Sequence, residues 1–125
     1  MGNSVLVIDD DPIIQRVVSA MLSVEGLTIR TAGTFSDALA LIDQQRPDVA
    51  ICDMMLETAS GLDFIDHCRH IPELATMPVI VISGSGDQQD MVQQALLHGA
   101  FACLSKPFSK GQISDAVKMA LLQHA

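Results

Sequence analysis

Short hydrophobic runs alternate along the chain with longer stretches in which hydrophobic residues recur at helical spacing. The runs cover residues 5–8, 27–31, 49–52, 79–82 and 101–104. Four of them are almost continuously apolar, which predicts strands that are covered on both faces. The run at 27–31 alternates apolar with polar residues, and this pattern predicts a strand at the edge of a sheet.

The stretches between and after the runs predict helices. The first stretch carries its hydrophobic residues at Ile13, Ile14, Val17, Val18, Met21 and Leu22. Asp11 followed by Pro12 predicts where this helix starts, and Gly26 predicts where it ends. Two further helix starts carry a capping pair, namely Thr34 with Asp37 and Ser109 with Gln112.

This alternation predicts a single α/β domain over residues 1–125, built as a (βα)5 chain. Right-handed crossovers turn such a chain into a doubly wound parallel sheet. Of the common strand orders, 2-1-3-4-5 places the alternating run 27–31 at an edge, as its pattern requires. Ligands then bind beyond the carboxyl ends of the strands, between the first and the third strand.

Composition limits the kinds of partner that the domain can bind and the cellular location that we expect for it. The net charge is −8, and the seven basic residues form no cluster, so we expect no nucleic-acid binding by this domain. We also expect no membrane association, because no apolar run is long enough to span a bilayer and no signal peptide is visible. The three cysteines form no metal motif and are expected to be reduced thiols in a cytoplasmic protein.

Polar residues whose side chains can bind ions or take part in reactions stand at the ends of four predicted strands. They are Asp9, Asp10 and Asp11 after the first strand, Asp53 after the third, Ser83 after the fourth and Lys106 after the fifth. Each alone has a plainer interpretation, since Asp and Ser favour turns and Asp11 serves as a helix cap. Their convergence on the crevice that topology predicts makes a functional site the better interpretation.

Electrostatics indicates what the acids do. Carboxylates held this close repel one another, and a hard divalent cation relieves the repulsion. Mg2+ takes oxygen ligands and keeps some of its waters. We expect Asp10 to bind Mg2+ directly, Asp9 directly or through water, and Asp53 and the backbone carbonyl of Met55 to add oxygens.

The remaining groups suit phosphoryl transfer. A carboxylate can act as a nucleophile and form an aspartyl phosphate, and Asp53 stands alone on the central strand. Lys106 would pair with Asp53 before transfer and with a phosphoryl oxygen afterwards, and Ser83 would hydrogen-bond another oxygen. Catalysis would then consist of positioning and charge stabilisation, so the chain would serve its own phosphorylation rather than act as an enzyme on other substrates.

These residues resemble the receiver domain of bacterial two-component response regulators from end to end. The matching features are the stretch 5–12, Asp53 with Gly61 eight residues on, the stretch 79–83, and Gly99 and Ala100 leading to Lys106, Pro107 and Phe108. The resemblance implies a five-stranded flavodoxin-like fold, Mg2+ as cofactor, Asp53 as phosphoacceptor, and Ser83 and Lys106 as the switch hydroxyl and lysine.

The resemblance also implies partners. The phosphoryl group would come from a sensor histidine kinase or a histidine phosphotransfer protein. Signalling would use the surface of the fourth helix, fifth strand and fifth helix, roughly residues 91–122. That surface would meet a separate target protein or an output domain missing from this chain, and a phosphorylation-dependent homodimer is compatible with it.

The chain departs from the family pattern at two positions, Cys103 and Glu57, and a third residue, Met55, bears on how long a phosphoryl group would last. Cys103 stands where the family usually has Tyr or Phe, and Phe101, of the same strand parity, is expected to take over part of that role. Glu57 replaces a frequent Pro. Met55 cannot orient a hydrolytic water well, which predicts a long-lived phosphoryl state.

Three rival functions compete with this interpretation. A phosphatase of the haloacid-dehalogenase type would use Asp9 as nucleophile, but only Asp115 follows Lys106 as a further acid. A flavodoxin-like redox module is disfavoured by three carboxylates where a flavin phosphate would bind. A receiver-like scaffold that is never phosphorylated stays open because of Cys103.

Overall fold

The computed structural model describes residues 3–23, 26–56, 59–84 and 89–123. A five-stranded parallel sheet of order β2-β1-β3-β4-β5 forms its centre, which confirms the predicted topology. The strands are β1 (Ser4–Ile8), β2 (Thr28–Ala32), β3 (Val49–Asp53), β4 (Val79–Ser83) and β5 (Ala102–Ser105). The helices are α1 (Pro12–Ser23), α2 (Phe35–Gln44), α3 (Gly61–Arg69), the short η1 (Pro72–Leu74), α4 (Gln89–Leu97) and α5 (Lys110–Gln123).

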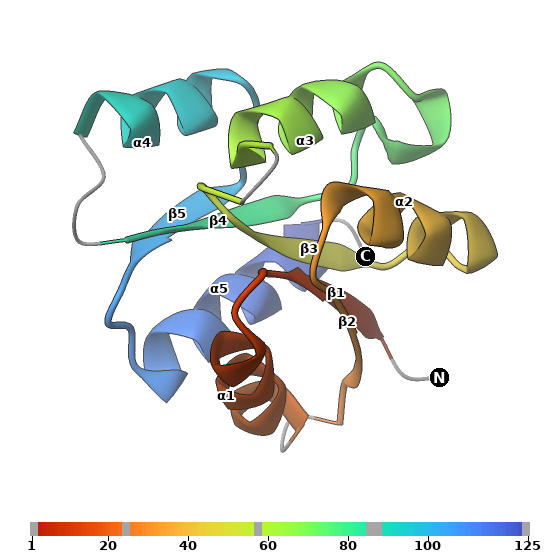
Figure 1. The fold of residues 1–125 in the computed structure, drawn as a ribbon. Helices are drawn as coiled ribbons and strands as arrows, with labels where there is room; N and C mark the ends of the chain where they lie inside the picture. Colours follow the sequence, from red (N-terminus) through yellow and green to blue (C-terminus); the bar gives the residue numbers. More distant parts are fainter. Residues whose placement is uncertain (1–2, 24–25, 57–58, 85–88, 124–125) are drawn as a thin grey trace.

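Helices cover both faces of the sheet, as Figure 1 shows: α1 and α5 lie on one face, and α2, α3 and α4 on the other. Successive side chains of a strand point to opposite faces, so β1 sends Leu6 and Ile8 to one hydrophobic cluster and Val5 and Val7 to the other. Strands β1, β3 and β4 are buried along their whole length. The candidate residues Asp9, Asp53 and Ser83 therefore stand at the ends of buried strands.

Of the two edge strands, β2 agrees with the exposure that its sequence predicts and β5 does not. Strand β2 is partly exposed, as its alternating pattern predicts. Strand β5 is also half-exposed, so the expectation that it is covered on both faces is wrong. It is apolar but lies at the other edge of the sheet, where helices cover it incompletely.

The predicted helix ends are observed. The Asp11 side chain accepts a hydrogen bond from the Ile13 amide at 2.9 Å, and Gly26 adopts a left-handed φ of 75° after α1. Side-chain caps are also present at the starts of α2, α3 and α5, made by Thr34, Ser60 and Ser109. In the part of the chain that the structure describes, no helix has the length and apolarity needed to cross a membrane.

Candidate functional site

Three carboxylates gather where the neighbouring strands β1 and β3 end. The register pairs Ile8 with Cys52, so Asp9 and Asp10 emerge beside Asp53. One oxygen from each of the three acids lies within 4.8 Å of the others, as the sequence predicts. Asp9 and Asp53 are buried, with 2% and 8% of their surface exposed, whereas Asp10 is exposed.

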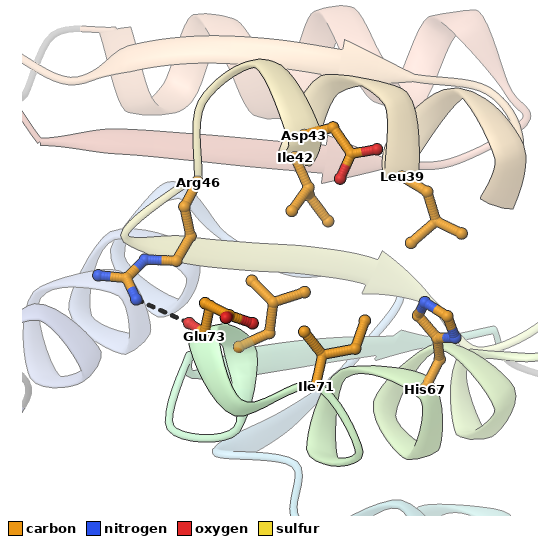
Figure 2. A pocket seen from close by; sticks show the side chains of 8 residues that line it. Leu39, Ile42, Asp43, Arg46, His67, Ile71 and Glu73 are labelled. Carbon is orange, nitrogen blue, oxygen red and sulfur yellow. Dashed lines mark hydrogen bonds between the residues drawn. The ribbon is translucent and has the colours of Figure 1, made fainter.

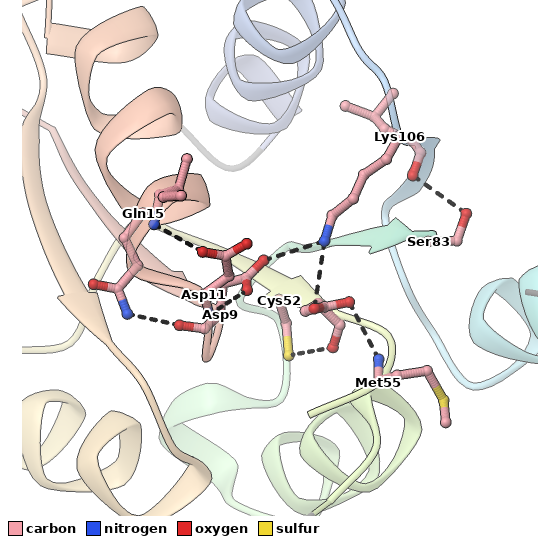
Figure 3. Close-up of polar contacts among 10 residues, drawn as sticks. Asp9, Asp11, Gln15, Cys52, Met55, Ser83 and Lys106 are labelled. Carbon is pink, nitrogen blue, oxygen red and sulfur yellow. Dashed lines mark hydrogen bonds and ion pairs between the residues drawn. The ribbon is translucent and has the colours of Figure 1, made fainter. Parts of the chain in front are cut away.

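Lys106 supplies the cation that faces two of these acids. Its Nζ lies 3.6 Å from Asp9 Oδ2 and 3.5 Å from Asp53 Oδ2 (Figure 3). Its backbone amide donates to the Ser83 carbonyl at 2.8 Å, which anchors the loop that carries it. One ammonium group is therefore shared between the two buried carboxylates, and the expected pairing with Asp53 is present.

The environment of Asp9 fits a bound cation. Its Oδ1 accepts a hydrogen bond from the Asp11 amide at 2.9 Å. Its buried Oδ2 has no hydrogen-bond partner in the described part of the chain, although Lys106 lies near it. Burial raises the pKa of the Asp9 carboxyl above its usual value, and the charge of Asp53 adds to the rise while the Asp11 amide opposes it. An oxygen-rich corner with an unsatisfied buried oxygen suits a hard ion such as Mg2+.

Asp53 is held from several sides. Its Oδ1 accepts from the Met55 amide at 3.2 Å, while the Cys52 thiol donates to its carbonyl. Gly61 packs against its backbone so closely that a Cβ at Gly61 would lie 3.0 Å from the Asp53 carbonyl oxygen. In the sequence, Gly61 matches the family only by its spacing from Asp53. The close contact in the structure gives the physical reason for a glycine at this position.

The loop after Asp53 turns back on itself. Met55 pairs with Ser60 in an antiparallel bridge whose hydrogen bonds use the carbonyls of Met54 and Ala59. The Met55 carbonyl takes part in neither bond. The Met55 side chain is 52% exposed, as expected of a group beside a solvent-accessible site. Glu57, a predicted departure from the family pattern, lies outside the described residues.

Ser83 is the last residue of β4, the strand next to β3 in the sheet. Its register neighbour on β5 is Ser105, and Ile82 just before it pairs with Asp53. The hydroxyl is buried and donates a long hydrogen bond of 3.4 Å to the Leu104 carbonyl. Ser83 thus stands between the acidic cluster and the loop of Lys106.

The expected role of Phe101 rests on a premise that is wrong. Cys103 packs against the cluster shared with α2, α3 and α4, whereas Phe101 packs against the opposite cluster, beside α1 and α5. Strand β5 begins only at Ala102, so the alternation of faces does not extend back to position 101. Phe101 also precedes the end of β5 that lies far from Ser83, so the observed geometry gives the expected role no support.

Hydrophobic surface lies beside the site and on the predicted signalling face. A hollow of about 340 Å³ next to Lys106 is lined by Ile14, Val17, Lys106, Pro107 and Phe108. On α4 and α5, the residues Leu96, Leu97, Met119 and Leu122 are exposed. The side chain of Met91, where the signalling surface was expected to begin, lies outside the described residues.

A separate hollow of about 360 Å³ lies between α2 and the segment from α3 to η1. Figure 2 shows aliphatic side chains of both segments facing each other across it, with Asp43, Arg46 and His67 around them. None of its lining residues belongs to the acidic cluster. The site predicted from the strand ends is therefore distinct from this hollow.

Known proteins place the chain in a family. The family model described as response regulator receiver domain matches residues 5–118. The chain is 38% identical over 117 residues to transcriptional regulatory protein KdpE of Mycobacterium tuberculosis, covering 94% of this chain and 50% of that protein. It is 31% identical over 122 residues to KDP operon transcriptional regulatory protein KdpE of Escherichia coli, covering 98% of this chain and 52% of that protein. The chain thus spans about half the length of these curated relatives.

Solved structures agree with this placement. A response regulator receiver domain protein from Clostridium thermocellum matches with a TM-score of 0.90 and 30% identity, over 98% of this chain and 96% of that one. The chemotaxis response regulator CheY4 of Vibrio cholerae matches with a TM-score of 0.87 and 26% identity, over 97% of this chain and 100% of that one. With its strand order and acidic cluster, this chain belongs to the response regulator receiver domain family.

Proposed function

We propose that Asp53 accepts a phosphoryl group from a sensor histidine kinase or a histidine phosphotransfer protein in a Mg2+-dependent reaction. The observation that carries this proposal is the Lys106 ammonium group, which faces the carboxylates of Asp9 and Asp53 at 3.6 and 3.5 Å. This ammonium group at the end of the central strands places positive charge beside the Asp53 carboxylate, where a phosphoryl group would arrive.

The transfer step forms one bond and breaks another. An oxygen of Asp53 attacks phosphorus, the P–N bond of the donor phosphohistidine breaks, and the imidazole nitrogen leaves with the electron pair. A bound Mg2+ ion would stabilise negative charge on the phosphoryl oxygens, and Asp9, Asp10, Asp53 and the Met55 carbonyl are the groups that would hold it. Lys106 then pairs with a phosphoryl oxygen, as in other charge-stabilised transfers.

The phosphorylated state signals by shifting the balance between two conformations. Ser83 would exchange its long bond to the Leu104 carbonyl for a phosphoryl oxygen, which would disturb the contact between β4 and β5. Exposed Leu96 and Leu97 on α4 give an output domain or a separate target protein apolar side chains to contact. The same surface suits a phosphorylation-dependent homodimer in the cytoplasm.

The phosphoryl donor needs its own contact beside the acceptor. The hollow next to Lys106 is mainly apolar, and Ile13 on the adjoining helix α1 is 65% exposed. An exposed hydrophobic patch at the rim of a reactive site is typical of a docking surface for another protein. A helical histidine-bearing donor that packs there would bring its phosphohistidine next to Asp53.

Labelling with a small acyl-phosphate donor tests the acceptor. Wild-type protein incubated with Mg2+ should gain the mass of one phosphoryl group, and Asp53→Asn should not. A chelator should abolish the label. Peptide mapping should place it on Asp53, because Lys106 lies beside this acid and can stabilise the charge of the phosphoryl group that it receives.

Two results would contradict the proposal. A label on Asp9 would favour the dehalogenase-type phosphatase, although family membership weighs against that rival. Absence of any label, with a small donor and with a set of histidine kinases, would favour the scaffold that is never phosphorylated.

A further inference from the structure

We propose that Gln15 is a positioning residue that holds the Asp9–Asp10 peptide and thereby sets the geometry of the cation site. This inference rests on the proposed function, because it concerns the same acids. Gln15 lies in α1, outside the acidic cluster, and sequence analysis gave it no role. Its side chain nevertheless bonds directly to the backbone of that cluster.

Two hydrogen bonds connect Gln15 to the loop between β1 and α1 (Figure 3). Its side-chain Nε2 donates to the Asp9 carbonyl at 2.6 Å. Its backbone amide donates to the Asp11 carbonyl at 3.1 Å, as a residue in the first turn of a helix does. The side-chain bond reaches back six residues and is not part of the normal helical pattern.

With this bond, the hydrogen-bonding groups of Asp9 are almost all engaged. Its amide donates to the Ala32 carbonyl at 3.0 Å, its Oδ1 accepts from the Asp11 amide, and its carbonyl accepts from Gln15. Its Oδ2 is the oxygen left to face Lys106 and a cation. Gln15 thus completes a set of contacts that leaves one orientation for this acid.

The same bond controls Asp10. Because the peptide unit is planar, a fixed Asp9 carbonyl also fixes the nitrogen and Cα of Asp10. The Asp10 carboxylate is exposed, so packing does little to orient it. The position of its backbone then decides how close its oxygens come to those of Asp9 and Asp53, which now lie within 4.8 Å.

The Gln15 amide has little freedom to move. A Cβ added at Gly33 would lie 3.7 Å from its Nε2, so the loop after β2 passes close to it. The side chain is also half-buried. A group held in place in this way can hold its partner, since less conformational entropy is lost when the bond forms.

Gln15→Leu removes the donor and keeps a side chain of similar size. The dissociation constant for Mn2+, followed by the electron paramagnetic resonance signal of the free ion, should rise roughly tenfold, the lower end of what supporting contacts contribute to metal sites. Labelling of Asp53 should slow at low Mg2+ and approach the wild-type rate at saturating Mg2+. Gln15→Arg keeps N–H donors and should restore the affinity.

Gln44→Leu makes the same chemical change at an exposed position of α2 and should behave as wild type. If Gln15→Leu binds Mn2+ as wild type does, while wild type is labelled on Asp53, the role of Gln15 is overturned and the proposed function stands. A second outcome also overturns the positioning role: Gln15→Leu and Gln15→Arg bind Mn2+ equally weakly and lose the same thermal stability. Gln15 would then have only a structural role. Wild-type protein that binds no divalent ion and takes no label overturns both proposals.

Discussion

Gly61 offers a sharp test of how tightly Asp53, the proposed phosphoacceptor, is held. It is the first residue of α3 and its amide donates to the Met54 carbonyl at 2.6 Å. In Gly61→Ala the new Cβ would meet the Asp53 carbonyl oxygen at 3.0 Å and Met54 Cα at 3.1 Å. Both neighbours are backbone atoms of a buried strand end, so neither can rotate away as a side chain would.

The magnitude follows from two opposing effects. Alanine is preferred over glycine in a helix by at most about 1 kcal/mol. Forcing a methyl group into a packed interior costs about 1–3 kcal/mol. We therefore expect Gly61→Ala to lose about 1–2 kcal/mol of unfolding free energy, or about 4–8 °C in Tm for a domain of this size.

Gly111→Ala is the matched control. Gly111 also lies in the first turn of a helix that starts with a serine cap, but a Cβ there would meet only the Ser109 hydroxyl at 3.8 Å. This variant should be unchanged or more stable by about 0.5 kcal/mol. Thermal unfolding by circular dichroism measures both, at the same pH and with a chelator present.

The displaced strand end should also affect phosphorylation. A shift of the Asp53 backbone by a few tenths of an ångström should slow its labelling roughly three- to tenfold, while Gly111→Ala should label as wild type. If Gly61→Ala is as stable as Gly111→Ala and labels at the wild-type rate, the Asp53 backbone is not held by this contact. The packing explanation for glycine at this position would then be refuted.

Three further predictions concern the acids and their neighbours. Asp9→Asn should stabilise the metal-free protein at neutral pH, because burial raises the pKa of the folded-state carboxyl and its ionised form opposes folding. In denaturant titrations this gain should grow as pH rises from the ordinary pKa of 3.8 through the raised one; a gain that shrinks contradicts it. Lys106→Met should lower the unfolding free energy of the metal-free protein by about 1–3 kcal/mol. The loss should be smaller in the Asp9→Asn background, because one of the two buried carboxylates is then neutral. Equal losses in both backgrounds would refute the sharing of Lys106 between Asp9 and Asp53. Met55→Asn should shorten the lifetime of the phosphoryl group several-fold, measured by mass after removal of the donor, and an unchanged lifetime would show that Met55 does not limit hydrolysis.

The strand-end residues could be predicted because two simple regularities locate them. Hydrophobic periodicity gives the strand ends to within a residue, as for β3, where the run 49–52 extends to Asp53. The strand order then brings Asp9, Asp10 and Asp53 to one edge. Neither step depends on side-chain conformation, so the acidic cluster is predicted together with the fold.

Contacts that depend on loop conformation could not be predicted in the same way. The bond from Gln15 to the Asp9 carbonyl requires the actual path of the loop between β1 and α1, and helical spacing marks Gln15 only as a polar position. The close approach of Gly61 to Asp53 depends on how the loop before α3 returns. The assignment of Phe101 failed because a one-residue change in where β5 starts removes the alternation on which it relied.

The charges at the site explain how one lysine, together with a divalent cation, can balance the three carboxylates. Three carboxylates against one ammonium group leave two negative charges, which a divalent cation would balance. Conversion of the Asp53 carboxylate to an acyl phosphate would raise the negative charge at this position from about one to about two, so Lys106 would be drawn toward the phosphoryl group and away from Asp9. The Lys106 amide is bonded to the Ser83 carbonyl, and the Ser83 hydroxyl is bonded only loosely to Leu104. Under the proposed function, a movement of Lys106 would reach the end of β5 through the backbone. This route to the proposed signalling face would require no aromatic ring at position 103.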